Sequence, residues 1–98
     1  MITVEDKATV LCRMALPLIQ LAKDKECAVQ FRLTDTTFNL EILEKSEGKR
    51  EFFDYYHVLD SNGRDWNMSE KDGEKLHVCF RTFESMKEIL WRIREALS

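Results

Sequence analysis

The middle of the chain, from Ala28 to Phe80, alternates apolar and polar residues, and the phases of successive segments agree with one another. Alternation with a period of two is typical of strands that bury one face and leave the other in water. Three such segments precede Asn62-Gly63, and two follow it. The pattern therefore predicts a half-buried sheet of five antiparallel strands.

Helical periodicity marks the beginning of the chain. Thr3 and Asp6 have the spacing of a capping box, and apolar residues then recur at steps of four and three. We expect this helix to run from about Val4 to Lys23. Pro17 falls inside it and removes one backbone hydrogen bond, so it is expected to kink or divide the helix.

The last helix is predicted to begin at Thr82 or at Ser85, the latter with Glu88 completing a capping box. Its apolar stripe consists of Phe83, Met86, Leu90, Ile93 and Leu97. The predicted fold class is α+β in the order α-β-β-β-β-β-α. We expect a five-stranded antiparallel meander with an N-terminal and a C-terminal helix packed on one face, as a single domain over residues 1–98.

Turn chemistry predicts the register of the last three strands. Asn62-Gly63 is a preferred sequence for a two-residue type I′ turn, which would place Trp66 opposite Leu59. A three-residue turn at residues 71–73, with its glycine in the left-handed conformation, would then place Trp66 opposite Val78. This register adds four residues to the core face: Trp66, Met68, Leu76 and Val78.

Charge and cysteine content narrow the function classes. The chain has 18 acidic and 15 basic residues, interleaved, with a net charge of −3. It lacks the basic stripe that nucleic-acid binding uses, and its many basic residues disfavour an acidic DNA mimic. Its three cysteines have no paired spacing, and no signal peptide or membrane-spanning run is recognisable, so we expect a cytoplasmic protein without disulfides or membrane contact.

The order of elements resembles the helix-sheet-helix plan of double-stranded-RNA-binding domains, with extra strands. Such domains carry a basic cluster at the start of their last helix, and this chain does not. The resemblance is therefore one of topology, which does not by itself confer function.

Three groups of residues have types that site chemistry requires. Residues 60–65 resemble a calcium loop, but the glycine is two places early and Lys71 stands where a bidentate Glu is needed. His77 and Cys79 share a strand face but supply too few zinc ligands, and their backbones are about 7 Å apart. The carboxylates expected on the polar face have no cleft around them: Glu41, Asp54 and Asp65. We expect no metal, no cofactor and no enzymatic activity.

The residues without a structural role in this fold are mainly aromatic. Phe52 and Tyr56 lie on the predicted open face with Arg81, and Trp91 lies with Lys87 on the last helix, away from its stripe. Exposed aromatic residues beside basic ones are typical of binding hot spots. In another arrangement, one helix crosses to the second face and buries Phe52 and Tyr56.

The sequence thus predicts a small acidic protein-protein interaction module. It would act as an inhibitor or adaptor on a larger partner, or as a homodimer. The predicted partner-binding residues are Phe52, Tyr56, Arg81, Lys87 and Trp91. The alternatives are a protein that binds or mimics nucleic acid and a small enzyme with an unrecognised site.

Overall fold

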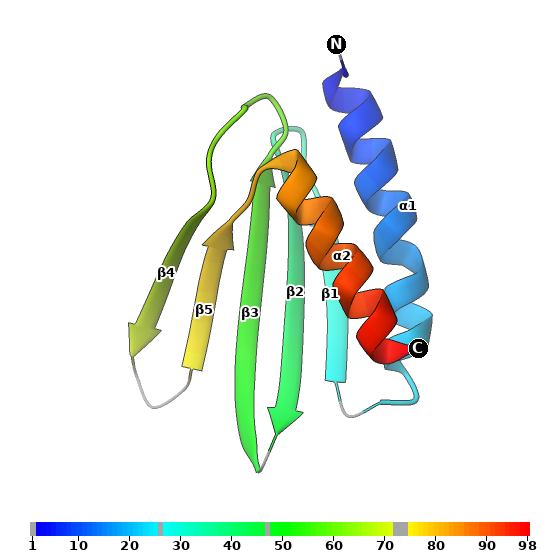
Figure 1. Cartoon of the computed structure of the whole chain (residues 1–98), viewed down its shortest axis with the longest axis vertical. Helices are drawn as coiled ribbons and strands as arrows, with labels where there is room; N and C mark the ends of the chain where they lie inside the picture. Colours follow the sequence, from blue (N-terminus) through cyan, green and yellow to red (C-terminus); the bar gives the residue numbers. More distant parts are fainter. Residues whose placement is uncertain (1, 26, 47, 72–74) are drawn as a thin grey trace.

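The computed structural model describes residues 2–25, 27–46, 48–71 and 75–98. Within them the chain forms two helices and one five-stranded mixed sheet, an α+β fold (Figure 1). The predicted order α-β-β-β-β-β-α is confirmed. The elements are α1 (Val4–Ala22), β1 (Cys27–Leu33), β2 (Thr37–Ser46), β3 (Lys49–Val58), β4 (Trp66–Lys71), β5 (Lys75–Phe80) and α2 (Phe83–Leu97).

Side-chain caps begin both helices. The Thr3 hydroxyl accepts a hydrogen bond from the Asp6 backbone N–H at 3.1 Å, and the Asp6 carboxylate accepts one from the Thr3 N–H at 3.3 Å, which confirms the capping box. The Thr82 hydroxyl accepts a hydrogen bond from the Ser85 N–H, so α2 is capped by Thr82. Pro17 stands inside α1, and the helix continues past it undivided.

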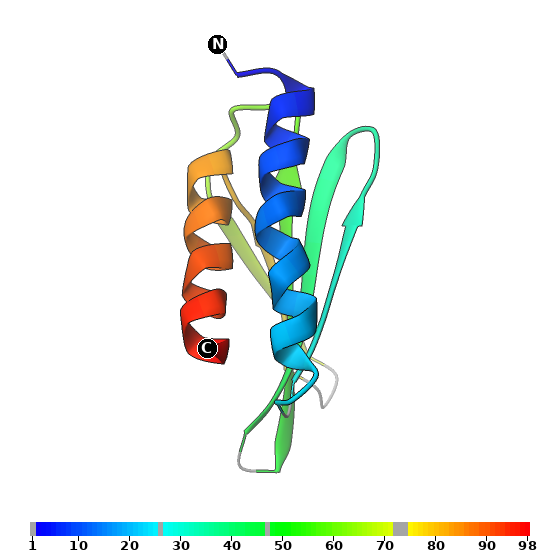
Figure 2. The same ribbon diagram turned by 90° about the vertical axis from the view of Figure 1, so that its right-hand side faces the viewer.

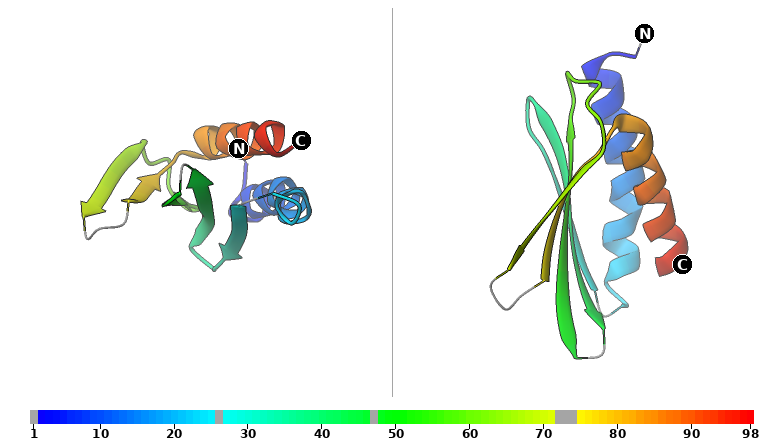
Figure 3. Two further views of the ribbon diagram at one scale, coloured as in Figure 1. Left: turned by 90° about the horizontal axis from the view of Figure 1, so that it is seen from below. Right: turned by 60° about the vertical axis from the view of Figure 1, so that its left-hand side comes forward.

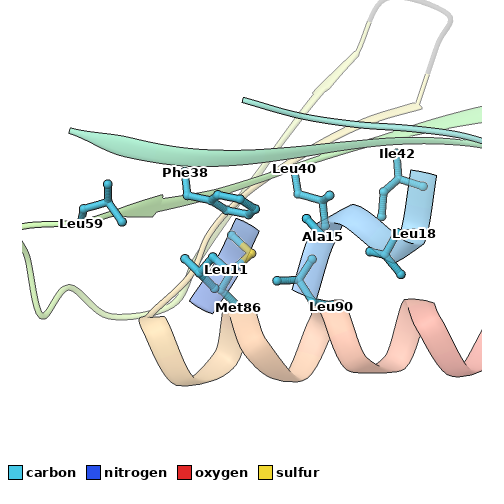
Figure 4. Packing of buried hydrophobic residues seen from close by; sticks show 9 residues of the cluster. All are labelled: Leu11, Ala15, Leu18, Phe38, Leu40, Ile42, Leu59, Met86 and Leu90. Carbon is cyan, nitrogen blue, oxygen red and sulfur yellow. The ribbon is translucent and has the colours of Figure 1, made fainter. Parts of the chain in front are cut away.

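Both helices cover the same face of the sheet, as predicted (Figure 2). Helix α1 packs on β1 and β2, while α2 packs on β3 and on α1. The apolar stripes of the two helices meet the inward residues of β2 to form one core (Figure 4). Its buried members are Leu11, Ala15, Leu18, Phe38, Leu40, Ile42, Leu59, Met86 and Leu90.

The sheet order is β1-β2-β3-β5-β4, so the predicted antiparallel meander is wrong. Strands β1, β2 and β3 are antiparallel neighbours, but β3 pairs with β5 in parallel. After β3, the chain passes over the end of β5, descends as the edge strand β4, and returns as β5 between β4 and β3 (Figure 1). A parallel neighbour cannot be reached through a tight hairpin, and the loop with β4 provides the crossover.

The Asn62-Gly63 pair does not form the predicted type I′ turn. Such a turn requires positive φ at both of its central residues. Gly63 does not have a positive φ, whereas Gly48, in the turn between β2 and β3, has a φ of 77°. The Ser61 hydroxyl instead accepts a hydrogen bond from the Gly63 N–H at 2.9 Å, which shapes a wider loop.

Asp65 holds the far end of this loop against the start of α2. Its carboxylate accepts hydrogen bonds from the Thr82 N–H at 3.0 Å and from the Ser85 hydroxyl at 2.6 Å. These bonds hold the pKa of Asp65 below its usual value. The loop therefore delivers β4 to the outer edge of the sheet, beyond β5.

The register of β4 and β5 differs by two residues from the prediction. Trp66 lies opposite Phe80 and Met68 lies opposite Val78, so the relative phase of the two strands is as predicted. Lys71, predicted as the first residue of the turn, instead ends β4 and pairs with Lys75. The rest of the predicted turn, with its left-handed glycine, lies outside the described residues.

The parallel pairing reverses the predicted faces of β4 and β5. Phe52 and Tyr56 point away from the helices, because they alternate with the inward residues of β3, and they lie beside Leu76 and Phe80 of β5. The four residues that we expected to join the core therefore project from the uncovered face: Trp66, Met68, Leu76 and Val78. The polar residues between them point to the helix side: Asn67, His77, Cys79 and Arg81.

Candidate functional site

The side of the sheet that faces away from the helices is called the open face below. Figure 3 shows that both helices lie over β1, β2 and β3, while β5 and β4 extend beyond them. In the described residues, no Cα atom of either helix lies within 8 Å of a Cα atom of β5 or β4. The arrangement in which one helix crosses to this face does not occur (Figure 2).

Apolar side chains from three neighbouring strands occupy the half of the open face formed by β3, β5 and β4. Trp66 is 51% exposed and Met68 is 40% exposed, although both are large and apolar. The other members are half-buried. This apolar patch consists of Phe52, Tyr56, Trp66, Met68, Leu76, Val78 and Phe80.

A row of three rings crosses the patch. The Phe80 ring lies between Tyr56, at 5.4 Å between ring centroids, and Trp66, at 5.2 Å. Aromatic pairs at these distances contribute about 0.5 to 1.5 kcal/mol each beyond their buried area. The half-exposed Trp66 ring is thus supported from one side. A cavity of about 280 Å³ adjoins the row and is bordered by Ser61 and Arg64 of the loop.

Two carboxylates lie beside the patch. Glu41 of β2 and Asp54 of β3 are direct partners across the strands, and both project to the open face. Burial raises the pKa of Asp54, and the nearby charge of Glu41 raises it further, against the effect of a hydrogen bond from Asn39. The Gln30 amide donates a hydrogen bond to the Glu41 carboxylate.

The structure separates the residues of the first predicted surface. Phe52 and Tyr56 share the open face, as predicted. Arg81 does not join them: its Nη2 donates to the Asn67 side-chain oxygen at 2.8 Å, and its guanidinium lies 6.0 Å from the Tyr55 ring centroid on the helix side. The placement of Arg81 on the open face was wrong because it depended on the phase of β5.

The second predicted surface lies on the outside of α2. Trp91 is 57% exposed, and it lines a shallow groove together with Lys87. The Lys87 ammonium is already engaged, at 3.0 Å from a Glu84 carboxylate oxygen and 4.6 Å from the Phe83 ring centroid. Trp91 is therefore the side chain of this surface that is most available for contact.

The candidates for metal and thiol chemistry are dispersed. In the described ranges, no three His, Cys, Asp or Glu side chains gather in a way that could hold a metal ion. His77 stacks on Phe53 at 4.7 Å between ring centroids, and Cys79 is buried. Asp65, from the segment that resembles a calcium loop, is engaged by α2. All three cysteines are free.

His57 is buried beneath the start of α2, with an exposed fraction of 2%. Its Nδ1 lies 3.0 Å from the Arg81 carbonyl oxygen, which can only accept, so Nδ1 carries the proton. Its Nε2 is buried and has no hydrogen-bond partner among the described residues. Burial lowers the pKa of His57 from its ordinary 6.5, and the Lys7 charge lowers it further, against the effect of the Arg81 hydrogen bond.

A histidine with a depressed folded-state pKa binds protons less readily in the folded than in the unfolded chain. The contribution of neutral His57 to the free energy of unfolding is therefore present above pH 6.5 and is lost as the pH drops below that value. We expect urea unfolding to show this loss between pH 7 and about pH 5. In His57→Gln, which keeps a donor for the carbonyl but does not titrate, this part of the pH dependence should disappear. An unchanged pH profile in the variant would contradict the assignment.

No helix in the described part of the chain has the length and apolar content needed to cross a bilayer. Comparison with known proteins assigns the chain to no family, because no family model, curated protein or solved structure matches it.

Proposed function

We propose that this protein is a protein-protein interaction module that binds its partner through the apolar patch. The observation that carries the proposal is the direction of the patch residues, which project from the side of the sheet that neither helix covers. Monomeric proteins rarely expose large contiguous apolar surfaces, and those that exist are often binding sites. Docking would remove this surface from water at a gain of about 25 cal/mol per Å².

The composition of the patch supports protein binding. Tryptophan and tyrosine are enriched among hot-spot residues, and the patch contains both, in contact with the ring of Phe80. A ring held by its neighbour loses little conformational entropy when a partner covers it. We therefore assign Trp66 as the main anchor, because it combines support from Phe80 with the greatest exposure in the patch.

The shape of the sheet also supports this proposal. Strands β5 and β4 project past the helices, so a partner reaches the patch without displacing either of them (Figure 3). An inhibitor or adaptor in the cytoplasm would act in this way, by covering an apolar surface of a larger protein. In a homodimer, the partner that covers the apolar patch would be a second copy of this chain.

Nucleic-acid binding is the second candidate, and the row of rings is the observation that favours it. Aromatic side chains on neighbouring strands can stack with the bases of a single strand. Glu41 and Asp54 share this face, however, and their charges would repel a phosphate backbone. We therefore favour a protein partner. An enzyme would use the same two carboxylates, Glu41 and Asp54, as acid and base. No described serine, cysteine or histidine in the patch lies beside them to act as a nucleophile.

A matched pair of tryptophan variants tests the proposal. The immobilised protein would capture partners from the native cytosol, with identification by mass spectrometry and titration of the captured protein. Trp66→Ser should weaken binding by about 2 kcal/mol or more, roughly 30-fold in Kd, because it removes the main anchor. Trp91→Ser, similarly exposed but on α2, should bind as the wild type does.

Thermal melting of both variants shows whether each remains folded. Loss of capture in Trp91→Ser with retention in Trp66→Ser would reject the apolar patch and assign the interface to the outside of α2. Capture of oligonucleotides that depends on Trp66 would support the nucleic-acid candidate instead.

A further inference from the structure

The centre of the open face is charged. Asp54 stands between Phe52 and Tyr56 along β3, and its neighbour on β5 is Val78, so apolar side chains surround it on three sides. On the fourth side lies its partner across the strands, Glu41. A protein that covers the whole apolar patch therefore also covers Asp54, with Glu41 at the border of the contact.

These carboxylates border a shallow cavity of about 300 Å³ in the open face. The side chains that line it on the open face form an apolar row and, beside it, a polar row. Those that project to the open face are Ala28, Gln30, Glu41, Leu43, Phe52 and Asp54. The cavity can therefore hold the aliphatic or aromatic stem of a side chain whose polar end meets the two carboxylates.

The groups that face the pair do not neutralise it. The Gln30 amide donates to Glu41, and the Asn39 amide, which donates to the Tyr55 carbonyl oxygen at 3.2 Å, lies beside Asp54; both amides are uncharged. Arg32 lies on the same face: burial and the charges of Asp54 and Glu41 raise the pKa of Tyr56, and the charge of Arg32 opposes that rise. Neither Glu41 nor Asp54 forms an ion pair with a described residue.

From this arrangement we infer that the partner presents a lysine or arginine side chain, set within an apolar surface, to the cavity that Glu41 and Asp54 line. The inference rests on the proposed function and specifies the partner's chemistry. Removing water from unpaired carboxylates is unfavourable, and a basic group in hydrogen-bond contact compensates for it. The raised pKa of Asp54 agrees with a carboxylate that lacks a counter-charge.

The same argument disfavours a second copy of this chain. A face-to-face dimer with twofold symmetry brings residues near the axis against themselves. With Asp54 at the centre of the open face, two such faces would place like charges together in an apolar interface. The charge thus selects against self-association and in favour of a basic partner.

Three small probes of similar shape and different charge test the inference: benzamidinium, benzamide and benzoate. Each would be titrated into the ¹⁵N-labelled protein and followed through its amide resonances. Benzamidinium should shift the resonances of residues 41–43 and 52–54 and bind at least about tenfold more tightly than benzamide, because its N–H groups form charge-assisted bonds with the carboxylates. Benzoate should bind more weakly than benzamide.

Asp54→Asn and Glu41→Gln should each reduce the preference for benzamidinium over benzamide. Glu44→Gln is the matched control, since Glu44 is an exposed carboxylate of the same strand that does not line this cavity. A second measurement is the ¹³C-detected pKa of the Asp54 carboxyl, which should fall when benzamidinium binds. Equal affinity for benzamidinium and benzamide, or equal effects of the Asp54 and Glu44 variants, would overturn the inference.

The two proposals fail separately. If the probes show no charge preference while Trp66→Ser still abolishes partner capture, the basic side chain is rejected and the apolar interface stands. If probe binding is as expected but capture does not depend on Trp66, the interface is rejected. A stable dimer of the wild-type protein in sedimentation equilibrium would contradict the selection against self-association.

Discussion

Phe38→Ala should lower the free energy of unfolding by about 3 to 5 kcal/mol, the range for removal of a fully buried phenylalanine. Phe38 has no exposed surface, lies between the sheet and both helices, and stacks on Phe31 at 5.8 Å between ring centroids (Figure 4). The substitution leaves a cavity that neighbouring side chains fill only in part. Urea unfolding monitored by circular dichroism measures the change.

Phe80→Ala is the matched control on the open face. Phe80 is half-buried and contacts Tyr56 and Trp66, so its removal should cost about 1 to 3 kcal/mol, from the loss of two ring pairs. In the antiparallel meander, the strand of Phe80 would have the opposite phase and Phe80 would belong to the core. Equal costs at Phe38 and Phe80 would therefore contradict the parallel pairing of β3 with β5.

The sequence predicts most of the local structure correctly. The capping box of Thr3, the phase of α1 and the stripe of α2 depend on residues within one helix, so the pattern contains all the required information. The first three strands are joined by short connections and pair in chain order. Their alternation is therefore sufficient to identify their inner and outer faces.

The order of the last two strands depends on contacts far apart in the chain. Alternation in β5 defines two faces but does not say which is covered, and the prediction took this choice from the turn at Asn62-Gly63. The hydrogen bonds of Asp65 to the start of α2 hold this segment as a wider loop. They connect residues 17 and 20 positions apart, which a local turn preference does not report.

For the candidate site, the sequence likewise predicted the positions of residues on β3 but not of those that depend on β4 and β5. Phe52 and Tyr56 were placed correctly because they belong to β3, whose phase is set by β2. Arg81 was misplaced, and Trp66 and Phe80 were missed, because their faces depend on β5. One sequence feature could have identified them: β4 and β5 each carry large apolar residues on a single face. The predicted register assigned that face to the core.

The position of Asp54 explains how a chain with such a face can remain a separate molecule. Exposed sheets with apolar faces tend to associate with one another, and charged residues that point into the face oppose this. Asp54 lies on the central strand of the open face, at the border of the apolar patch, where it would be buried in a face-to-face stack of two copies. A partner with a basic group escapes this penalty, so the same residue opposes self-association and favours a complementary surface.

Leu18→Ala should lower the free energy of unfolding by about 2 to 5 kcal/mol, as is usual when a buried leucine is truncated. Leu18 has no exposed surface and lies on the same stripe of α1 as Leu11 and Ala15. It directly follows Pro17, which removes one hydrogen bond of the helix. The burial of Leu18 shows that the helical phase continues past the proline and directs the last turn of α1 at the core.

Leu16→Ala provides the control one residue before the proline. Leu16 is 58% exposed, so its truncation removes little buried surface and should change the free energy of unfolding by about 0.5 kcal/mol or less. Both substitutions replace leucine with the best helix former, so differences in helix propensity cancel between them. Because only burial distinguishes the two sites, similar costs would mean that α1 loses its phase at Pro17 and that Leu18 does not pack against the sheet.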